Sequence, residues 1–352
     1  MNQNKKKNLK IQPMKILQNK DYSKNRSKRL LMMLFLLFAL GITLTTSTYA
    51  WFTSNRIATV WLMDVKVAAQ NGIEISADAI DWGSEITIED LQDAHLTYPA
   101  SINQLPTILE PVSTIGEVEA GQLKMFYGKV ENARNSSSNF TLRTSRLTEE
   151  RGFGDDFNGK FLAFDIFLRT TTPTELYLTE ESGVTYNGEE SAGIENSMRF
   201  AFVVEGNTAT NTPVSTAQVM RTSSRNNVYI WEPNYNIHTE AAIENARSVY
   251  GMNVTSPSGV LSYEGVKAEI PKSAGVMINT AKKSNFPAYF DTVKVDYTSR
   301  VNFDDYIQIF NADAGITKIR VYVWIEGQDI DCENNAAVGG MKLNLQFTTN
   351  PS

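Results

Sequence analysis

Alternation of apolar with other residues, repeated in several separate segments, is the feature that most constrains the fold of this chain. In KIRVYVWIEG (318–327), every second residue from Ile319 to Ile325 is apolar, so these side chains share one face of an extended strand. The same period recurs in MKLNLQFT (341–348), FLAFDIFLRT (161–170) and MRFAFVVEG (198–206). Such segments predict half-buried strands of an antiparallel sheet, with the intervening residues on the opposite face.

The predicted strands are irregularly spaced, and few long amphipathic runs lie between them. This pattern predicts an all-β protein, a jelly-roll or Ig-like antiparallel β-sandwich with long loops. The one segment with a good helical pattern is IHTEAAIENARSVY (237–250), and residues 86–93 are expected to form a turn or two of helix. We expect a single β-sandwich domain over 51–352, with a polar insertion around 205–300 that begins with a Thr-, Asn- and Ser-rich loop at 205–227.

The first 50 residues have the three parts of a secretory signal peptide. Residues 1–29 hold ten Lys or Arg and one Asp, and residues 30–44 carry no charge. The small residues Thr48 and Ala50 then precede Trp51, so we expect a signal peptidase to cleave after Ala50. The resulting protein would be secreted or associated with the cell surface.

An uncleaved anchor stays open as the alternative to cleavage. The apolar run 30–44 is shorter than the about 20 residues that a spanning helix needs. The uncharged stretch continues to Asn55, however, so residues 30–52 could hold the protein in a membrane with the basic end inside. Both alternatives export the rest of the chain.

The charge of the exported part excludes nucleic acid as a partner. The whole chain has 33 basic and 39 acidic residues; the first 50 residues account for ten and one of these, which leaves 23 and 38 and a net charge of −15. Such a surface repels phosphates and anionic lipids. The single cysteine, Cys332, excludes internal disulfides and is expected to be buried, so folding depends on a hydrophobic core.

A further strand is predicted at 57–67, close to the expected new N-terminus. Trp61, Met63, Val65 and Val67 alternate there with other residues and would form its inward face. An apolar strand in this position is an aggregation hazard unless it pairs with a sheet. It can pair with the sandwich of its own chain, or it can be donated to the sheet of a neighbouring subunit.

The sequence TYAWFTSN (48–55) followed by this strand resembles the start of proteins exported through the SipW-type signal peptidase of Gram-positive bacteria. The best-known members of that group are the TasA fibre subunit of biofilm matrices and its relative camelysin. The close resemblance covers about residues 30–68. It implies a jelly-roll sandwich and assembly into fibres by passing the N-terminal strand to the next subunit.

Nothing in the sequence predicts catalysis. The two histidines, His95 and His238, lie outside any zinc-protease motif and are expected in solvated loops. No glycine-rich phosphate loop or dinucleotide fingerprint is present. We therefore expect no enzyme activity, no catalytic residue and no cofactor.

One acidic segment, EGQDIDCENN (326–335), leaves a calcium site open. Asp329, Asp331 and Glu333 have the alternate spacing that begins a calcium loop, but the glycine and the closing glutamate of such a loop are missing. The preferred interpretation is an acidic turn whose side chains bond its own backbone. The polar loop GFGDDFNGK (152–160) is interpreted in the same way.

Two functions from different classes follow from these patterns. The first is a secreted structural protein, a matrix or fibre subunit that associates with copies of itself. The second is a cell-surface module that binds glycans through an aromatic face, for which Tyr322, Trp324, Tyr229 and Trp231 are the candidates. Packing of these aromatics against a covering layer is the alternative to a glycan-binding face.

Overall fold

The computed structural model of the chain describes residues 60–132, 140–187, 193–250, 254, 263–297, 307–332 and 339–349. All of these belong to one compact unit, Ser47–Ser352. The expected signal peptide, its cleavage residues Thr48, Ala50 and Trp51, and Glu333 of the acidic segment lie outside the described residues.

The described chain is built mostly from strands, as the alternating sequence pattern predicts. The first large sheet has the strand order β20 (Ile307–Ala312), β13 (Thr174–Leu178), β22 (Gly339–Thr348), β1 (Val60–Ala69) and β3 (Glu85–Ile86), with β14 (Gly183–Asn187) also paired to β22 and β5 (Ile108–Leu109) to β1. The second has the order β11 (Gly152–Gly154), β4 (Gln104–Pro106), β12 (Leu162–Thr170), β21 (Gly315–Ile325), β15 (Met198–Thr208), β16 (Val228–Glu232) and β19 (Asp296–Tyr297), with β2 (Glu74–Ser76) paired to β12.

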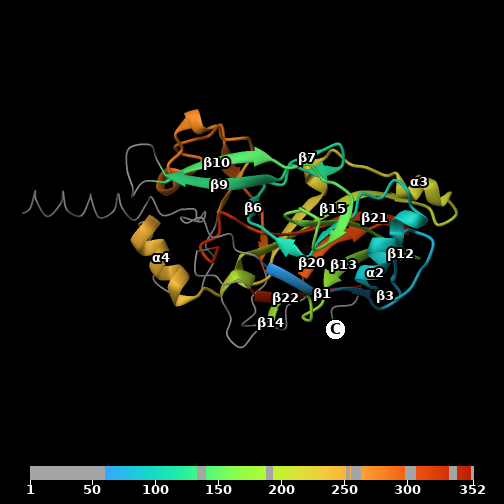
Figure 1. Cartoon of the computed structure of the whole chain (residues 1–352). Coiled ribbons are helices and arrows are strands. Elements are labelled where there is room, and N and C mark those ends of the chain that lie inside the picture. The colour runs from blue at the N-terminus through green and yellow to red at the C-terminus, as the bar shows by residue number, and fades with distance from the viewer. Residues whose placement is uncertain are drawn as a thin grey trace, which may run out of the picture. The chain divides into compact units, whose positions relative to one another are not determined.

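Smaller elements surround these two sheets. A third sheet joins β10 (Phe140–Arg146), β9 (Phe126–Asn132) and β6 (Val112–Ser113), and two strand pairs join β17 (Glu264–Val266) to β18 (Phe290–Thr292) and β7 (Val118–Glu119) to β8 (Gln122–Leu123). The α-helices are α2 (Ile88–Asp93), α3 (Val214–Gln218) and α4 (Glu240–Tyr250). The 3-10 turns are η1 (Ala94–Leu96), η2 (Ile194–Ser197), η3 (Arg225–Asn227), η4 (Lys272–Ala274) and η5 (Ile278–Thr280). Figure 1 places α2 and α3 at one end of the sheets and α4 at the other.

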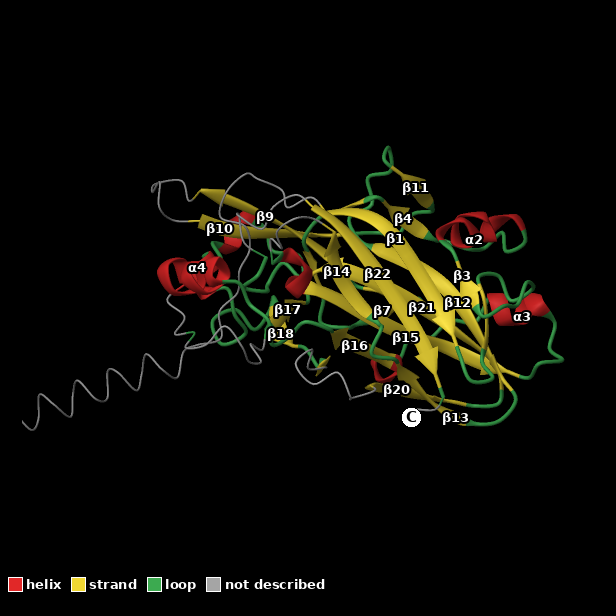
Figure 2. Cartoon of the chain, turned by 90° about the horizontal axis from the view of Figure 1, so that it is seen from below, coloured by secondary structure: helices red, strands yellow, loops and turns green. Residues whose placement is uncertain are grey.

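The two large sheets pack face to face, which makes the fold a β-sandwich (Figure 2). Their shared core contains the alternating apolar residues that the sequence singles out, among them Leu343 and Leu345 of β22 and Phe164 and Val321 of the second sheet. The prediction of an all-β sandwich with few short helices is confirmed. Helical segments predicted at 237–250 and 86–93 correspond to α4 and α2.

Pairing within the sheets is mixed rather than purely antiparallel. In the second sheet β21 lies between β12 and β15 and is antiparallel to both. In the first sheet β1 runs parallel to β22. Parallel neighbours need a long connection, and here almost the whole described chain separates the two strands.

The central strands β12, β21 and β15 of the second sheet are covered on both faces, which corrects the expectation that they are half-buried. Every residue of β21 is buried. Its second face, with Tyr322 and Trp324, packs against Leu123, Met125 and other apolar residues that precede β9. A further apolar cluster joins α4 to β9, β10, β17 and β18, so the expected polar insertion contributes a packed layer of its own.

Among the described helices, none is long and apolar enough to cross a membrane.

Candidate functional site

The first candidate site is the seam between β1 and β22. The predicted strand 57–67 is observed as β1, Val60–Ala69, and its backbone pairs with β22 from Val60 opposite Gly339 to Ala69 opposite Phe347. On its other side β1 has shorter antiparallel partners, β3 and β5. In this single chain the N-terminal strand therefore occupies an interior position of the first sheet.

The register along this seam shifts once. Leu62 lies opposite Met341, and Asp64 lies opposite Lys342, so Met63 is the extra residue of a bulge. Beyond the bulge, Val65 and Val67 pair with Leu343 and Leu345. The strict alternation expected from Trp61 to Val67 is thus interrupted at Met63.

The apolar side chains of β22 along this seam belong to the shared core. Met341, Leu343, Leu345 and Phe347 are all buried, whereas Lys342 between them is exposed. Ala68 and Ala69 at the end of β1 are buried as well. The seam therefore closes one edge of the shared core.

β1 leaves the sheet through a tight turn at 70–73. Gln70 N donates to Phe347 O at 2.9 Å, and Asn71 Nδ2 donates to Thr348 Oγ1 at 2.8 Å. Asn71 and Gly72 have φ values of 56° and 83°, the left-handed region that favours Asn and Gly. Within the described residues this turn is the covalent junction between β1 and the rest of the fold.

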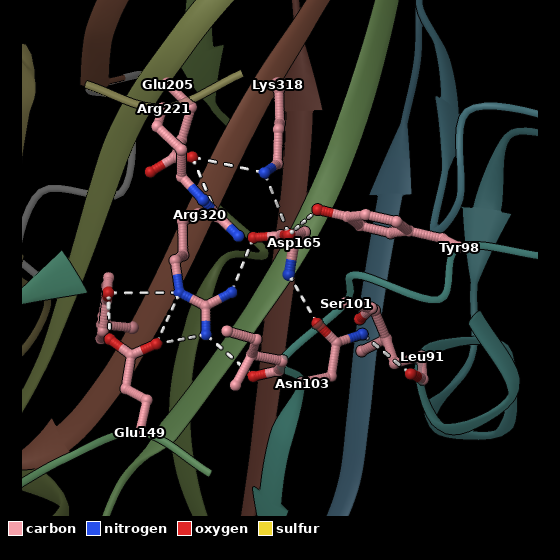
Figure 3. Close-up of polar contacts among 12 residues, drawn as sticks. Leu91, Tyr98, Ser101, Asn103, Glu149, Asp165, Glu205, Arg221, Lys318 and Arg320 are labelled. Atoms are coloured by element: carbon pink, nitrogen blue, oxygen red, sulfur yellow. Dashed lines mark hydrogen bonds and ion pairs between the residues drawn. The ribbon is translucent and has the colours of Figure 1, made fainter. Parts of the chain in front are cut away.

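The second candidate site is a group of buried charges on the outer face of the second sheet (Figure 3). Arg320 of β21 donates through Nη1 to Asp165 Oδ1 at 2.7 Å and through Nε to Glu149 Oε2 at 2.9 Å. Lys318, two residues earlier on the same face, lies with its Nζ 3.2 Å from Asp165 Oδ2 and 3.3 Å from Glu205 Oε2. The side chains of Lys318, Asp165 and Glu205 are fully buried.

Two loop residues, Arg221 and Tyr98, and Tyr322 of β21 complete this group. Arg221 donates through Nη1 to Glu205 Oε2 at 3.1 Å, and Tyr98 donates its hydroxyl to Asp165 Oδ2 at 2.9 Å. Tyr322 donates its hydroxyl to Glu149 Oε1 at 2.5 Å. We call Lys318, Arg320, Arg221, Asp165, Glu205, Glu149, Tyr98 and Tyr322 the buried charge network. It contains three cations and three carboxylates, so the charges balance.

The two inner carboxyls of the network differ in their protonation. Burial opposes ionisation of Asp165, but Arg320, Lys318 and Arg221 outweigh it and hold the pKa of Asp165 well below its ordinary value. Burial raises the pKa of Glu205, and Lys318 offsets this only in part. Glu205 is therefore easier to protonate than an ordinary glutamate, and Asp165 is harder to protonate than an ordinary aspartate.

Sequence reasoning missed this network. Lys318 and Arg320 alternate with apolar residues, and such a pattern is typical of a strand with one solvent-facing side. The carboxylates that pair with them lie more than 100 residues away in the sequence, and no local pattern connects them. The signal for such a network is a balanced set of charged residues at alternate positions of neighbouring strands. It can be recognised only when the pairing of the strands is known.

The acidic turn after β21 forms a third polar group, also buried. Asp329 Oδ2 pairs with Arg199 Nη2, and Asp331 Oδ2 lies 2.6 Å from His238 Nδ1. Asp331 N donates to Asp329 Oδ1 at 2.8 Å, as expected for a turn whose side chains bond its own backbone. Asp331 Oδ1 also accepts from Thr239 N at 3.1 Å and so ties this turn to the start of α4.

These bonds bear on the calcium candidate. The carboxylates of Asp329 and Asp331 face Arg199, His238 and backbone N–H groups, and Glu333 lies outside the described residues. In the part of the chain that the structure describes, no three His, Cys, Asp or Glu side chains are arranged to hold a metal ion.

The histidines and the cysteine occupy different surroundings. The expectation of two solvated histidines is wrong for His238, which is buried against Asp331 because it sits where α4 docks on the acidic turn. His95 is half-buried in η1, with Nδ1 2.7 Å from Gln92 O. Cys332 is buried in the shared core, as expected for a small apolar side chain.

The four aromatics proposed as a glycan-binding face do not share a face. Tyr322 and Trp324 pack under the outer covering layer. The Trp231 ring is tilted against Phe200 with centroids 5.0 Å apart, and the Tyr229 ring is tilted against Phe310 with centroids 5.6 Å apart, both against the core on the opposite side of the sheet. Packing against covering layers therefore accounts for their positions.

Two surface cavities among the described residues lie apart from these groups. One of about 370 Å³ lies between β2, β3 and α2 and is lined by several carboxylates, among them Asp81, Glu85 and Asp93. The other, about 360 Å³, is lined in part by Asp156 and Asn158 of the polar loop 152–160. Asp155 of that loop instead accepts from Thr107 Oγ1 at 2.7 Å.

Comparisons with known protein families, curated proteins and solved structures found no match to this chain.

Proposed function

We propose that this chain is a secreted structural protein, a subunit of an extracellular matrix or fibre that assembles through its N-terminal strand. The observation that carries the proposal is the place of β1: an N-terminal strand in the interior of a sheet, joined to the fold by one short turn. The acidic exported chain, its signal-like leader and its resemblance to TasA-type proteins agree with this function.

Strand exchange needs no new contacts. The backbone bonds that β1 makes with its own β22 can be made in the same register with the β22 of another copy. A vacated seam would expose Leu343, Leu345 and Phe347, and burying each such side chain is worth about 1.5–3 kcal/mol. An empty seam is therefore a strong acceptor for a neighbour's strand.

The way in which copies exchange β1 determines which assembly forms. If each copy gives its strand to the next and receives one from the previous copy, the contact is head to tail. A head-to-tail contact that does not close on itself produces a filament. The alternative function, a glycan-binding surface module, has less support because its candidate aromatics are divided between two buried faces.

The proposal is tested with the chain that begins at Trp51. We expect filaments in negative-stain micrographs and fast-sedimenting species in the ultracentrifuge, and soluble folded monomers after deletion of residues 51–60. Val65→Asp, which introduces a charge at the position paired with the buried Leu343, should also prevent polymerisation. Lys66→Glu, which lies opposite the half-buried Asn344, is the matched control and should leave polymerisation intact.

A truncated chain that polymerises as well as the complete one would show that β1 is not the link. Circular dichroism of each variant separates loss of assembly from loss of the β fold.

A further inference from the structure

Lys318 lies between two carboxylates that come from the strands on either side of its own. It is on β21; Asp165 is on β12 and Glu205 is on β15, the two neighbours of β21 in the second sheet (Figure 3). Its Nζ is 3.2 Å from Asp165 Oδ2 and 3.3 Å from Glu205 Oε2, and all three side chains are fully buried. An amine is thus held against two carboxyl groups in a site closed to bulk water.

A bulge places Glu205 in this position. The register of β15 against β21 shifts between Val204 and Gly206, so Glu205 is the extra residue at the level of Lys318. Gly121 allows the chain to pass close by, because a Cβ there would lie 3.1 Å from Glu205 Oε1 and 2.5 Å from Arg221 Cδ. The bulge and the glycine therefore leave room for the Glu205 carboxyl group.

The two oxygens of Glu205 have different surroundings. Oε2 accepts from Lys318 Nζ and from Arg221 Nη1. Oε1 is buried and has no hydrogen-bond partner within the described residues. An ionised carboxylate would leave that oxygen uncompensated, whereas a protonated carboxyl, which the raised pKa of Glu205 also favours, carries less charge there.

We propose that Lys318 and Glu205 join in an intramolecular isopeptide bond, with Asp165 as the group that moves the proton. The ammonium of Lys318 first passes a proton to Glu205 along their hydrogen bond, which gives a neutral amine and a neutral carboxyl. That hydrogen bond ends on Oε2, so Oε2 becomes the hydroxyl and Oε1 the carbonyl oxygen. Nζ then attacks the side-chain carbonyl carbon of Glu205, and the negative charge develops on Oε1, while Arg221 stays bonded to Oε2, the oxygen that will leave.

The remaining steps release water. Asp165 accepts the proton that Nζ loses as the C–N bond forms and returns it to the hydroxyl on Oε2, the Glu205 oxygen that lies against the same Nζ. The C–O bond breaks, one water leaves, and the products are an amide between Lys318 and Glu205 and an unchanged Asp165. No oxidant, metal or external reactant is needed.

Asp165 suits the role of proton carrier rather than that of reacting carboxyl. Arg320 donates to its Oδ1 and Lys318 lies beside its Oδ2, and these cations keep it ionised, which makes its carbon a poor target for an amine. Glu205 also has two cationic partners, Lys318 and Arg221, but both contact Oε2, and its Oε1 accepts no hydrogen bond within the described residues. The bond would fasten β15 to β21 at the centre of the second sheet, in a chain whose only cysteine excludes an internal disulfide.

Peptide mapping tests whether Lys318 and Glu205 are linked. The purified full-length chain is held folded at neutral pH before digestion. Trypsin would normally give 200–221, 301–318 and 319–320; with the bond present, 200–221 and 301–320 appear as one species, lighter than their sum by one water, about 18 Da. Fragmentation then places the link on Glu205.

Two other results would overturn the assignment. One is a digest with unlinked 301–318, and the other is a link from Lys318 to the Asp165 peptide, 161–169. Lys318→Arg keeps the positive charge but has no amine that can form the amide, so its 200–221 should be free. Asp165→Asn, which cannot carry the proton as a carboxylate does, should slow linkage in a chain whose circular dichroism is unchanged.

Discussion

At the residue scale, the unusual feature of this protein is charge placed inside a sandwich. Arg320 and Arg199 are both fully buried, and each is held by two carboxylates. Buried pairs contribute little net stability compared with apolar residues, but a buried charge that loses its partner is costly. The two arginines therefore act as constraints on which strands can pair with which.

Replacing Arg320 with Met should destabilise the fold strongly. The substitution leaves Asp165 and Glu149 buried without their main partner, and breaking such a pair costs about 3–5 kcal/mol. Urea denaturation measures the change. Lys272→Met, which removes an exposed ion pair with Glu131, is the control and should leave the transition nearly unchanged. Equal effects of the two substitutions would contradict the role given to burial.

Glu326 should make the protein less stable as the pH rises. Burial raises the pKa of Glu326 from its ordinary 4.5 to about 7, so the folded chain keeps a proton that the unfolded chain has released. This stabilisation is complete below the unfolded pKa of 4.5 and is lost as the pH rises through about 7. Each unit of the shift corresponds to about 1.4 kcal/mol.

Urea titrations at about pH 5 and about pH 8 check this dependence. Glu326→Gln cannot titrate, so its two transitions should differ less than those of the unaltered chain. If the two transitions of Glu326→Gln differ as much as those of the unaltered chain, the pH dependence of stability comes from other buried acids. Glu232 and Asp331 are examples, since burial raises their pKa values to about 8 and about 6.

At the element scale, the covering layer depends on close backbone contacts. Gly265 of β17 packs so near β6 that a Cβ would lie 2.1 Å from Thr114 O. Gly265→Ala should destabilise the protein by about 1–3 kcal/mol, the usual cost of overpacking. Gly83→Ala, where the nearest atom would be at 3.6 Å, is the matched control in the unfolding measurement. An unaffected Gly265→Ala would mean that this layer is loosely attached.

The sequence predicts the elements better than their partners. Period-2 alternation correctly indicates β12, β15, β21 and β22, and the helical pattern indicates α4. The burial of both faces of β21 was not predictable, because Lys318 and Arg320 resemble solvent-facing residues until their distant carboxylates are known. The parallel β1–β22 pairing was equally hidden, since it joins the two ends of the described chain.

At the scale of the whole molecule, the two ends of the described chain meet in one seam. β1 supplies one strand of that seam and β22 the other, and within the described residues the turn at 70–73 is the covalent junction between β1 and the remaining fold. Within one chain this closes the core; between chains the same pairing would link subunits. The protein is therefore a monomer if β1 pairs with β22 of its own chain, and a polymer if β1 pairs with β22 of a neighbouring copy.

Cross-linking between copies tests this central claim most directly. On a Cys332→Ala background, one chain carries Lys66→Cys and a second carries Asn344→Cys, positions that lie opposite each other across the seam. Both chains begin at Trp51 and are assembled together before mild oxidation. The account predicts disulfide-linked dimers that contain one chain of each kind. It is contradicted if mixed chains stay unlinked while a single chain with both substitutions forms only an internal disulfide.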